Sequence, residues 1–167
     1  AKNSEQLEAI RAYVQPTLLA LRSKGISVKF DDDDTKKPGW KFAEYEFKGY
    51  PVRIAIGPRD MENGTVEVAR RDTLEKQVMQ ITDIADKIEH LLQAIQDNLF
   101  QKALAMREAG TRAVDSYEEF KVEIEKGGSL LAHWAGAAET EARVKEETKA
   151  TIRCLPLDGD GAPGHCM

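Results

Sequence analysis

The segment from residue 40 to residue 76 carries side chains that are suited to contacting an unpaired nucleic-acid base. Trp40, Phe42 and Tyr45 offer flat rings on which a base can stack. Arginine and lysine can donate to guanine O6 and N7, and carboxylates can accept from guanine N1 and N2. The residues of these two kinds are Arg53, Arg59, Lys76, Glu46 and Asp60. Spacing alone favours a plainer alternative, in which the charges are solvated and the aromatic side chains lie in the core.

Other catalytic and ligand-binding patterns are missing from the sequence. Neither a Walker-type lysine loop nor a dinucleotide-binding glycine pattern follows a predicted strand, which argues against an ATP site. The histidines at 90, 133 and 165 do not stand beside a serine or cysteine elbow, so we predict no catalytic residue. The aspartates at 31–34 lack EF-hand spacing, and His165 with Cys166 supplies fewer ligands than a structural zinc site needs. We therefore predict no metal site.

Composition narrows the class of protein. The chain has 167 residues, of which 41% are hydrophobic and 32% charged, which is enough for a globular core. No apolar run approaches the roughly 20 residues of a membrane span, and the sequence does not open on a signal-like pattern. The two cysteines, Cys154 and Cys166, are too few for a disulfide framework. We therefore predict a cytoplasmic protein without a membrane partner.

The charge distribution limits how the chain could bind nucleic acid. A net charge of −5 argues against a protein that coats nucleic acid through a general basic surface, because such binding needs many cations. Residues 35–76 nevertheless hold nine basic residues against seven acidic ones, a small positive surplus in an otherwise acidic chain. A nucleic-acid site is therefore expected to be local and to lie in this stretch.

Hydrophobic periodicity predicts an α/β fold for the first two thirds of the chain. Leu7, Ile10, Val14 and Leu18 recur at helical spacing, and Val52 and Ile54 alternate as in a half-buried strand. An Asn-Gly turn signal precedes a second alternating stretch. The predicted order is helix 4–24, strand 26–30, helix 41–48, strands 52–56, 65–70 and 77–81, and helix 83–108.

A smaller α/β part is predicted to follow. Ser116 and Glu119 stand at capping-box spacing, and the glycine pair at 127–128 ends the helix that they begin. The remaining pattern predicts a β-α-β unit after this helix. The predicted elements are helix 114–126, strand 129–134, helix 137–148 and strand 150–155. The chain is thus expected to divide into domains 1–108 and 109–167.

Several ordered motifs resemble one known family. The stretch PGWKFAEYEFKGYPVRIAIGPRD at 38–60, with the Arg-Arg-Asp triplet at 70–72, resembles the anticodon-binding domain of prolyl-tRNA synthetases of the archaeal and eukaryotic-like type. The stretches VDSYEEFK at 114–121, LAHWAG at 131–136 and KEETKATIRCLPL at 145–157 resemble the C-terminal extension of that family. The resemblance covers nearly the whole chain.

The resemblance implies a fold, a function and a site. The fold would be the mixed-sheet anticodon-binding domain of class II synthetases, followed by a small α/β C-terminal domain. The function would be recognition of the proline tRNA anticodon, which is marked by a pair of guanines, within a ligase that attaches proline to its tRNA using ATP. Phe42 would stack on a base, Glu46, Arg53, Arg59 and Asp60 would hydrogen-bond guanine edges or adjoining backbone, and Lys76 would contact a base or phosphate.

The resemblance also sets expectations about what this chain lacks. ATP and Mg²⁺ would belong to the catalytic domain of the parent enzyme, so no cofactor is expected here, and the parent would be a homodimer. The apolar strand that opens the family's domain is expected to be missing. Zinc is not expected, because family cysteine positions are occupied by Ala135, Thr140 and Cys166, with the fourth beyond Met167.

Two alternatives remain open at this point. The chain could be the anticodon module of a threonyl, glycyl or histidyl enzyme, although those do not normally carry the extension seen at 114–157. It could also be a non-catalytic accessory subunit that binds nucleic acid through the same fold. Selectivity among transfer RNAs separates these alternatives.

Overall fold

The computed structural model describes residues 4–157, 159 and 163–167. The chain forms two compact units, Ala1–Gln101 and Lys102–Met167. The helix that runs from the first unit into the second contains the predicted boundary at residue 108, and the limits 1–108 and 109–167 stay a prediction. Among the helices of the described residues, none combines the length and the apolar character that crossing a membrane requires.

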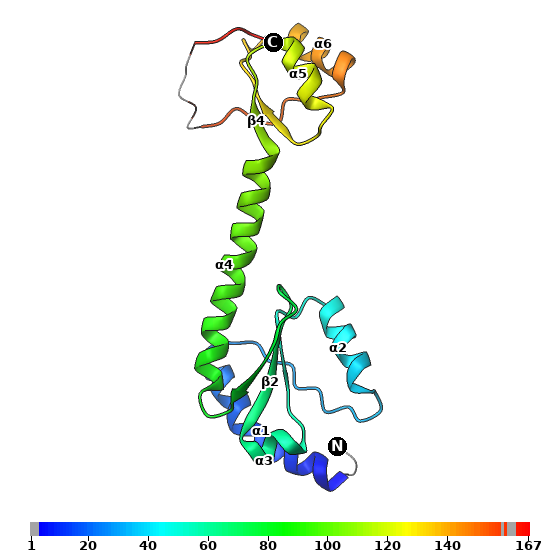
Figure 1. The fold of residues 1–167 in the computed structure, drawn as a ribbon, viewed down its shortest axis with the longest axis vertical. Helices are drawn as coiled ribbons and strands as arrows, with labels where there is room; N and C mark the ends of the chain where they lie inside the picture. The colour runs from blue at the N-terminus through cyan, green and yellow to red at the C-terminus, as the bar shows by residue number, and fades with distance from the viewer. Residues whose placement is uncertain (1–3, 158, 160–162) are drawn as a thin grey trace. The chain divides into compact units, whose positions relative to one another are not determined.

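The first unit is built on a three-stranded antiparallel sheet in the order β1-β2-β3 (Figure 1). In Figure 1 the sheet lies between α4 on one side and α2 on the other. Its elements are α1 (Ser4–Ser23), α2 (Pro38–Phe47), β1 (Val52–Ala55), α3 (Pro58–Asn63), β2 (Thr65–Arg70), β3 (Lys76–Gln80) and the first part of α4 (Ile84–Gly110). The helices predicted at 4–24, 41–48 and 83–108 and the three strands predicted from residue 52 onward are confirmed, with small shifts at their ends.

One face of this sheet carries the core. Val66 and Val68 of β2 are 0% and 2% exposed, and they pack against Leu21 of α1 and against Ile84 and Ile88 of α4. Alternation along each strand sends the intervening side chains to the opposite face. The alternation along β2 therefore determines which side chains lie on the face away from the core, where they can contact a ligand.

The register of the sheet aligns three residues on that opposite face. Arg53 of β1 is paired with Ala69 of β2, and Ala69 is paired with Lys76 of β3. These residues form a row across the sheet, with neighbouring strands about 4.8 Å apart. Glu67 and its partner Val78 lie in the next row. We call this surface the open face.

The first unit differs from the sequence prediction in one predicted strand that does not form and in one helix that was not predicted. The segment 26–30 is extended but forms no strand, because the N–H of Ile26 donates to the carbonyl of Leu21 in α1 rather than to a neighbouring strand. Its apolar side chains still pack against the core. The short helix α3 was not predicted; it begins at Pro58, whose ring suits the first helical position, and Gly64, with φ of 65°, caps its C-terminal end.

The second unit contains a short parallel pair of strands. Its elements after α4 are β4 (Thr111–Ala113), α5 (Tyr117–Ile124), β5 (Ser129–Leu131) and α6 (Ala138–Thr148). Thr111 pairs with Ser129, and α5 forms the crossover between the two strands. Val114, Phe120 and Met167 form the buried core of the unit.

The predicted β-α-β unit at 129–155 is therefore wrong. The parallel partner of β5 precedes it in the chain, and the crossover helix is α5 rather than α6. The segment 150–155 forms no strand, and its Leu155 side chain is 67% exposed. Strand-like alternation in this segment does not produce a strand, because no backbone partner lies beside it among the described residues.

Candidate nucleic-acid interface

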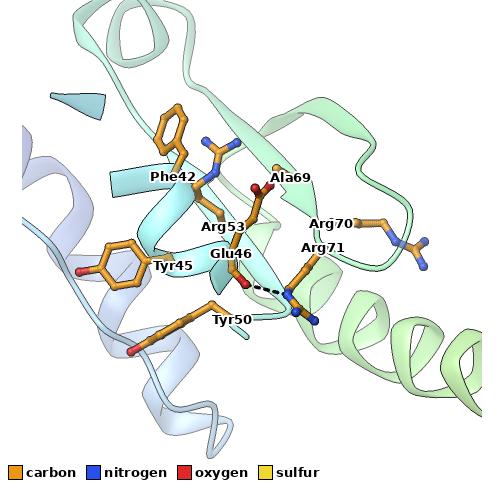
Figure 2. Close-up of a pocket in the computed structure, with 8 residues that line it drawn as sticks. All are labelled: Phe42, Tyr45, Glu46, Tyr50, Arg53, Ala69, Arg70 and Arg71. Atoms are coloured by element: carbon orange, nitrogen blue, oxygen red, sulfur yellow. Dashed lines mark hydrogen bonds between the residues drawn. The ribbon is translucent and has the colours of Figure 1, made fainter. Parts of the chain in front are cut away.

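A pocket lies where α2 meets β1 and β2 (Figure 2). Three of the site residues predicted from the sequence, Phe42, Glu46 and Arg53, lie in it together. Figure 2 shows the Phe42 ring beside the Arg53 guanidinium, with the side chain of Glu46 extending toward them. The residues that line the pocket are Phe42, Tyr45, Glu46, Tyr50, Arg53, Ala69, Arg70 and Arg71.

Arg53 and Phe42 form a stacked pair at this pocket. The guanidinium carbon of Arg53 lies 3.5 Å from the centre of the Phe42 ring, a cation–π contact. Its Nη1 also donates to Glu67 Oε1 at 3.3 Å, and the Arg53 side chain is only 15% exposed. The guanidinium is therefore held in place before any ligand arrives. A base that stacks on Phe42 must use the other face of the ring or displace Arg53.

Asp31, the first residue of the acidic run at 31–34, anchors α2. Asp31 accepts from Lys41 Nζ at 2.8 Å through Oδ1 and from the Tyr45 hydroxyl at 2.9 Å through Oδ2. The hydrogen bond to Asp31, together with burial, raises the pKa of Tyr45 to about 12. The Tyr45 ring meets the Tyr50 ring edge to face at 5.0 Å between centroids. These contacts hold the helix that presents Phe42 and Glu46.

Two consecutive arginines have different roles beside the pocket. Arg71 Nε donates to the backbone oxygen of Glu46 at 2.8 Å, which binds the C-terminal turn of α2 to the β2–β3 hairpin. Arg70 instead pairs with Asp72, and Asp72 also accepts from the amide of Asn98 in α4 at 2.6 Å. Figure 2 shows the Arg70 side chain pointing away from the other pocket residues. Arg70 therefore connects the hairpin to α4 rather than serving the pocket.

The remaining predicted site residues lie outside the pocket. Lys76 is exposed on the open face, in the same row as Arg53. Arg59 and Asp60 are on α3, which follows the other end of β1. The structure therefore gathers Phe42, Glu46 and Arg53, places Lys76 on the same face, and leaves the α3 pair separate.

Asp60 has a structural role within α3. Its Oδ2 accepts from the N–H of Gly57 at 2.8 Å, and its Oδ1 accepts from the Thr65 hydroxyl at 3.5 Å. Asp60 at N3 thus makes the one bond of a capping box that a glycine N-cap allows, and it satisfies a backbone donor at the start of the helix. A contact between Asp60 and RNA therefore has to use the carboxylate lone pairs that take no part in these two hydrogen bonds.

We expect Asp60→Ala to destabilise the first unit by about 1 kcal/mol, because the Gly57 N–H loses its acceptor. Urea unfolding followed by circular dichroism measures this effect. Glu62→Ala on the same short helix is the matched control, since Glu62 is exposed and not part of the cap. Equal stability of Asp60→Ala and Glu62→Ala would contradict the structural role.

The predicted set did not include several pocket residues. Tyr50, Ala69, Arg70 and Arg71 also line the pocket, and the sequence carried a motif signal for the two arginines. The Arg-Arg-Asp triplet at 70–72 belongs to the motifs that suggested the family. Alternation along β2 also places Ala69 on the face opposite Val68, but only the register puts it beside Arg53.

Ala135 and Cys166, which the resemblance placed at zinc-ligand positions, contact each other in the C-terminal unit. The N–H of Ala135 donates to Cys166 Sγ at 3.3 Å, and the N–H of Met167 donates to the carbonyl of His133 at 3.1 Å. Within the described residues, no group of three or more His, Cys, Asp or Glu side chains is placed to hold a metal ion. Hydrogen bonds and the core around Phe120 hold this part together.

Comparison with known proteins identifies the family. Residues 2–91 match the family model described as "Anticodon binding domain". The chain belongs to the anticodon-binding domain family. Residues 117–167 match a second model, described as "Prolyl-tRNA synthetase, C-terminal". The predicted resemblance is thus confirmed over both units.

Individual relatives agree with this assignment to the anticodon-binding domain family. A proline–tRNA ligase of Porphyromonas gingivalis is 59% identical over 166 residues, covering 99% of this chain and 34% of that protein. The proline–tRNA ligase of Cytophaga hutchinsonii is 58% identical over 167 residues, with the same coverage of 99% and 34%. The chain therefore spans about a third of the length of the curated relatives it matches.

A solved structure shows the same fold. The crystal structure of prolyl-tRNA synthetase from Cryptosporidium parvum, complexed with L-proline and AMP, superposes with a TM-score of 0.85 and 29% sequence identity. The match covers 98% of this chain and 33% of that one. The predicted mixed-sheet anticodon-binding domain with a small C-terminal α/β domain is confirmed.

Proposed function

We propose that this chain recognises the anticodon of proline tRNA as part of a ligase that attaches proline to its tRNA using ATP. The observation that carries the proposal is the convergence of Phe42, Glu46 and Arg53 on one pocket of an anticodon-binding fold. A ring, an acceptor and a donor in one place match what an unpaired guanine offers. The names of the relatives support proline as the amino acid.

Each site residue has a proposed role. Phe42 stacks on a guanine, and the exposed carboxylate of Glu46 accepts from its N1 and N2 groups. Arg53 donates to a guanine edge, and Lys76 contacts a base or a phosphate from the same face of the sheet. Arg59 and Asp60, at the other end of β1, contact the second guanine or the adjoining backbone. The two ends of β1 thus serve two neighbouring nucleotides.

The wider setting of the function is also part of the proposal. ATP and Mg²⁺ act in the catalytic part of the parent ligase, and the present chain supplies the tRNA contact. The parent enzyme is a homodimer in the cytoplasm. None of the roles proposed for the described residues involves bond formation, so the chain contributes to tRNA selection rather than to ester formation.

Fluorescence anisotropy with labelled anticodon stem-loops tests this function. We expect the chain to bind a proline stem-loop at least about 10-fold more tightly than the same stem-loop with both guanines replaced by adenine, because each wrong base weakens binding by roughly 1–3 kcal/mol. Equal binding of both RNAs would favour the accessory-subunit alternative. Preference for a threonine, glycine or histidine stem-loop would assign the chain to another class II enzyme.

A further inference from the structure

Arg71 lies at the edge of the pocket with its guanidinium already oriented. Its backbone N–H donates to the carbonyl of Pro51 at 3.0 Å, and its Nε donates to the carbonyl of Glu46 at 2.8 Å. Figure 2 shows this side chain turned toward α2, while the Glu46 side chain extends toward Ala69. The group that orients Arg71 is therefore a backbone oxygen, which leaves the positive charge unneutralised.

The neighbouring arginines differ from Arg71 in this respect. Arg70 forms two hydrogen bonds to the carboxylate of Asp72, and Arg53 pairs with Glu67. Within the part of the chain that the structure describes, no carboxylate lies within ion-pair distance of Arg71. A fixed arginine without an acidic partner, beside a pocket for a base, has the properties of a phosphate ligand.

We propose that Arg71 binds a phosphate of the RNA backbone next to the nucleotide whose base enters the pocket. The two terminal amino groups of the guanidinium form the fork that suits a phosphate, while Nε stays on Glu46. Because α2 carries both the Glu46 carbonyl and Phe42, the same helix positions the phosphate ligand and the stacking ring. This inference rests on the proposed function and adds a contact that does not depend on base identity.

Salt-dependent binding of the 167-residue chain to the proline stem-loop tests the contact. We expect Arg71→Ala to bind about 10-fold more weakly at low salt, and its slope of log affinity against log salt to fall by about 0.7–1. The ratio of affinities for the guanine and adenine stem-loops should stay within about twofold of wild type. Arg22→Ala, which removes an exposed charge from α1, is the matched control and should leave both quantities unchanged.

Arg71→Gln separates phosphate binding from support of α2. Glutamine keeps a side-chain N–H that can donate to Glu46 but carries no charge. We expect it to lose affinity as Arg71→Ala does, with an unchanged melting temperature. Full affinity of Arg71→Gln, or a loss of guanine preference in either variant, would overturn the inference.

Stem-loops with a single neutral methylphosphonate linkage locate the phosphate. At one position in the loop, the neutral linkage should weaken binding of the wild-type chain about 10-fold and should leave binding of Arg71→Ala unchanged. If the loss caused by the neutral linkage and the loss caused by Arg71→Ala add at every position, the proposed contact is overturned. The linkage at one position can depend on Arg71 while the wild-type chain shows no preference for guanine. In that case the phosphate contact stands and the proposed anticodon function fails, so the two outcomes are distinguishable.

Discussion

Replacing Arg53 with alanine is expected to weaken binding of a proline anticodon stem-loop by about 1–3 kcal/mol, roughly 5-fold to 150-fold. The guanidinium lies 3.5 Å from the Phe42 ring and donates to Glu67, so its orientation is set before RNA binds. The alanine variant loses this preformed donor and also uncovers one face of Phe42. Anisotropy titrations of the two proteins measure the difference.

Comparison across RNAs shows whether Arg53 reads a base. The loss caused by Arg53→Ala should be large for the guanine stem-loop and small when the guanines are replaced by adenine. A stem-loop carrying 7-deazaguanine, which lacks N7, should bind the wild-type chain more weakly than the guanine stem-loop does. Arg53→Ala should bind these two stem-loops equally. Arg22→Ala again controls for general charge. Equal losses for all RNAs would exclude a base-reading role and leave only a role in charge or packing.

Replacing Asp72 with asparagine is expected to lower the free energy of unfolding of the first unit by about 3 kcal/mol. The Asp72 side chain is 2% exposed and accepts from Arg70 and from Asn98, which joins the β2–β3 hairpin to α4. In the variant, the Arg70 charge remains largely enclosed without a carboxylate partner. Urea unfolding at neutral pH measures the loss.

The pH dependence of the same variant gives a second check. The Arg70 hydrogen bonds, supported by Asn98, lower the pKa of Asp72 from 3.8 to about 2. Because folding favours the ionised form, the stabilisation is complete above about pH 4 and disappears as the pH falls toward 2. The difference in stability between wild type and Asp72→Asn should therefore shrink over this interval.

Glu44→Gln is the matched control for Asp72→Asn, because Glu44 forms an ion pair with Lys48 that is open to solvent, with the two side chains 32% and 54% exposed. We expect this variant to show no measurable change in unfolding, since exposed ion pairs contribute little. A stability difference for Asp72→Asn that stays constant from pH 6 to pH 2 would contradict the ionic origin of the effect.

Elements with a strong local pattern were predictable from the sequence. The strand predicted at 65–70 is β2, because Val66 and Val68 alternate directly after an Asn-Gly turn signal. The long helix predicted at 83–108 is α4, whose buried residues Ile84, Ile88 and Ile95 recur at helical spacing. Each of these signals is contained in a few consecutive residues.

Elements that depend on a distant partner were not predictable. Segments 26–30 and 150–155 have the composition of strands, but no neighbouring backbone pairs with them in the described part of the chain. The strand β4 directly follows α4, so its three residues had no pattern of their own. Strand formation is a property of two segments, and a pattern in one of them cannot identify the other.

The sequence by itself determined the chemistry available to this protein: an aromatic and charged stretch at 38–76, and the ordered motifs that indicated the anticodon-binding family. Only the tertiary structure decided which of those side chains meet. Strand register aligned Arg53, Ala69 and Lys76, and packing of α2 brought Phe42 onto Arg53. The hydrogen bond of Asp60 to Gly57 depends on a helix that was not predicted. The physical reason is that a binding site is made by contacts between segments distant in sequence, and residue types alone do not encode the register and packing that create those contacts.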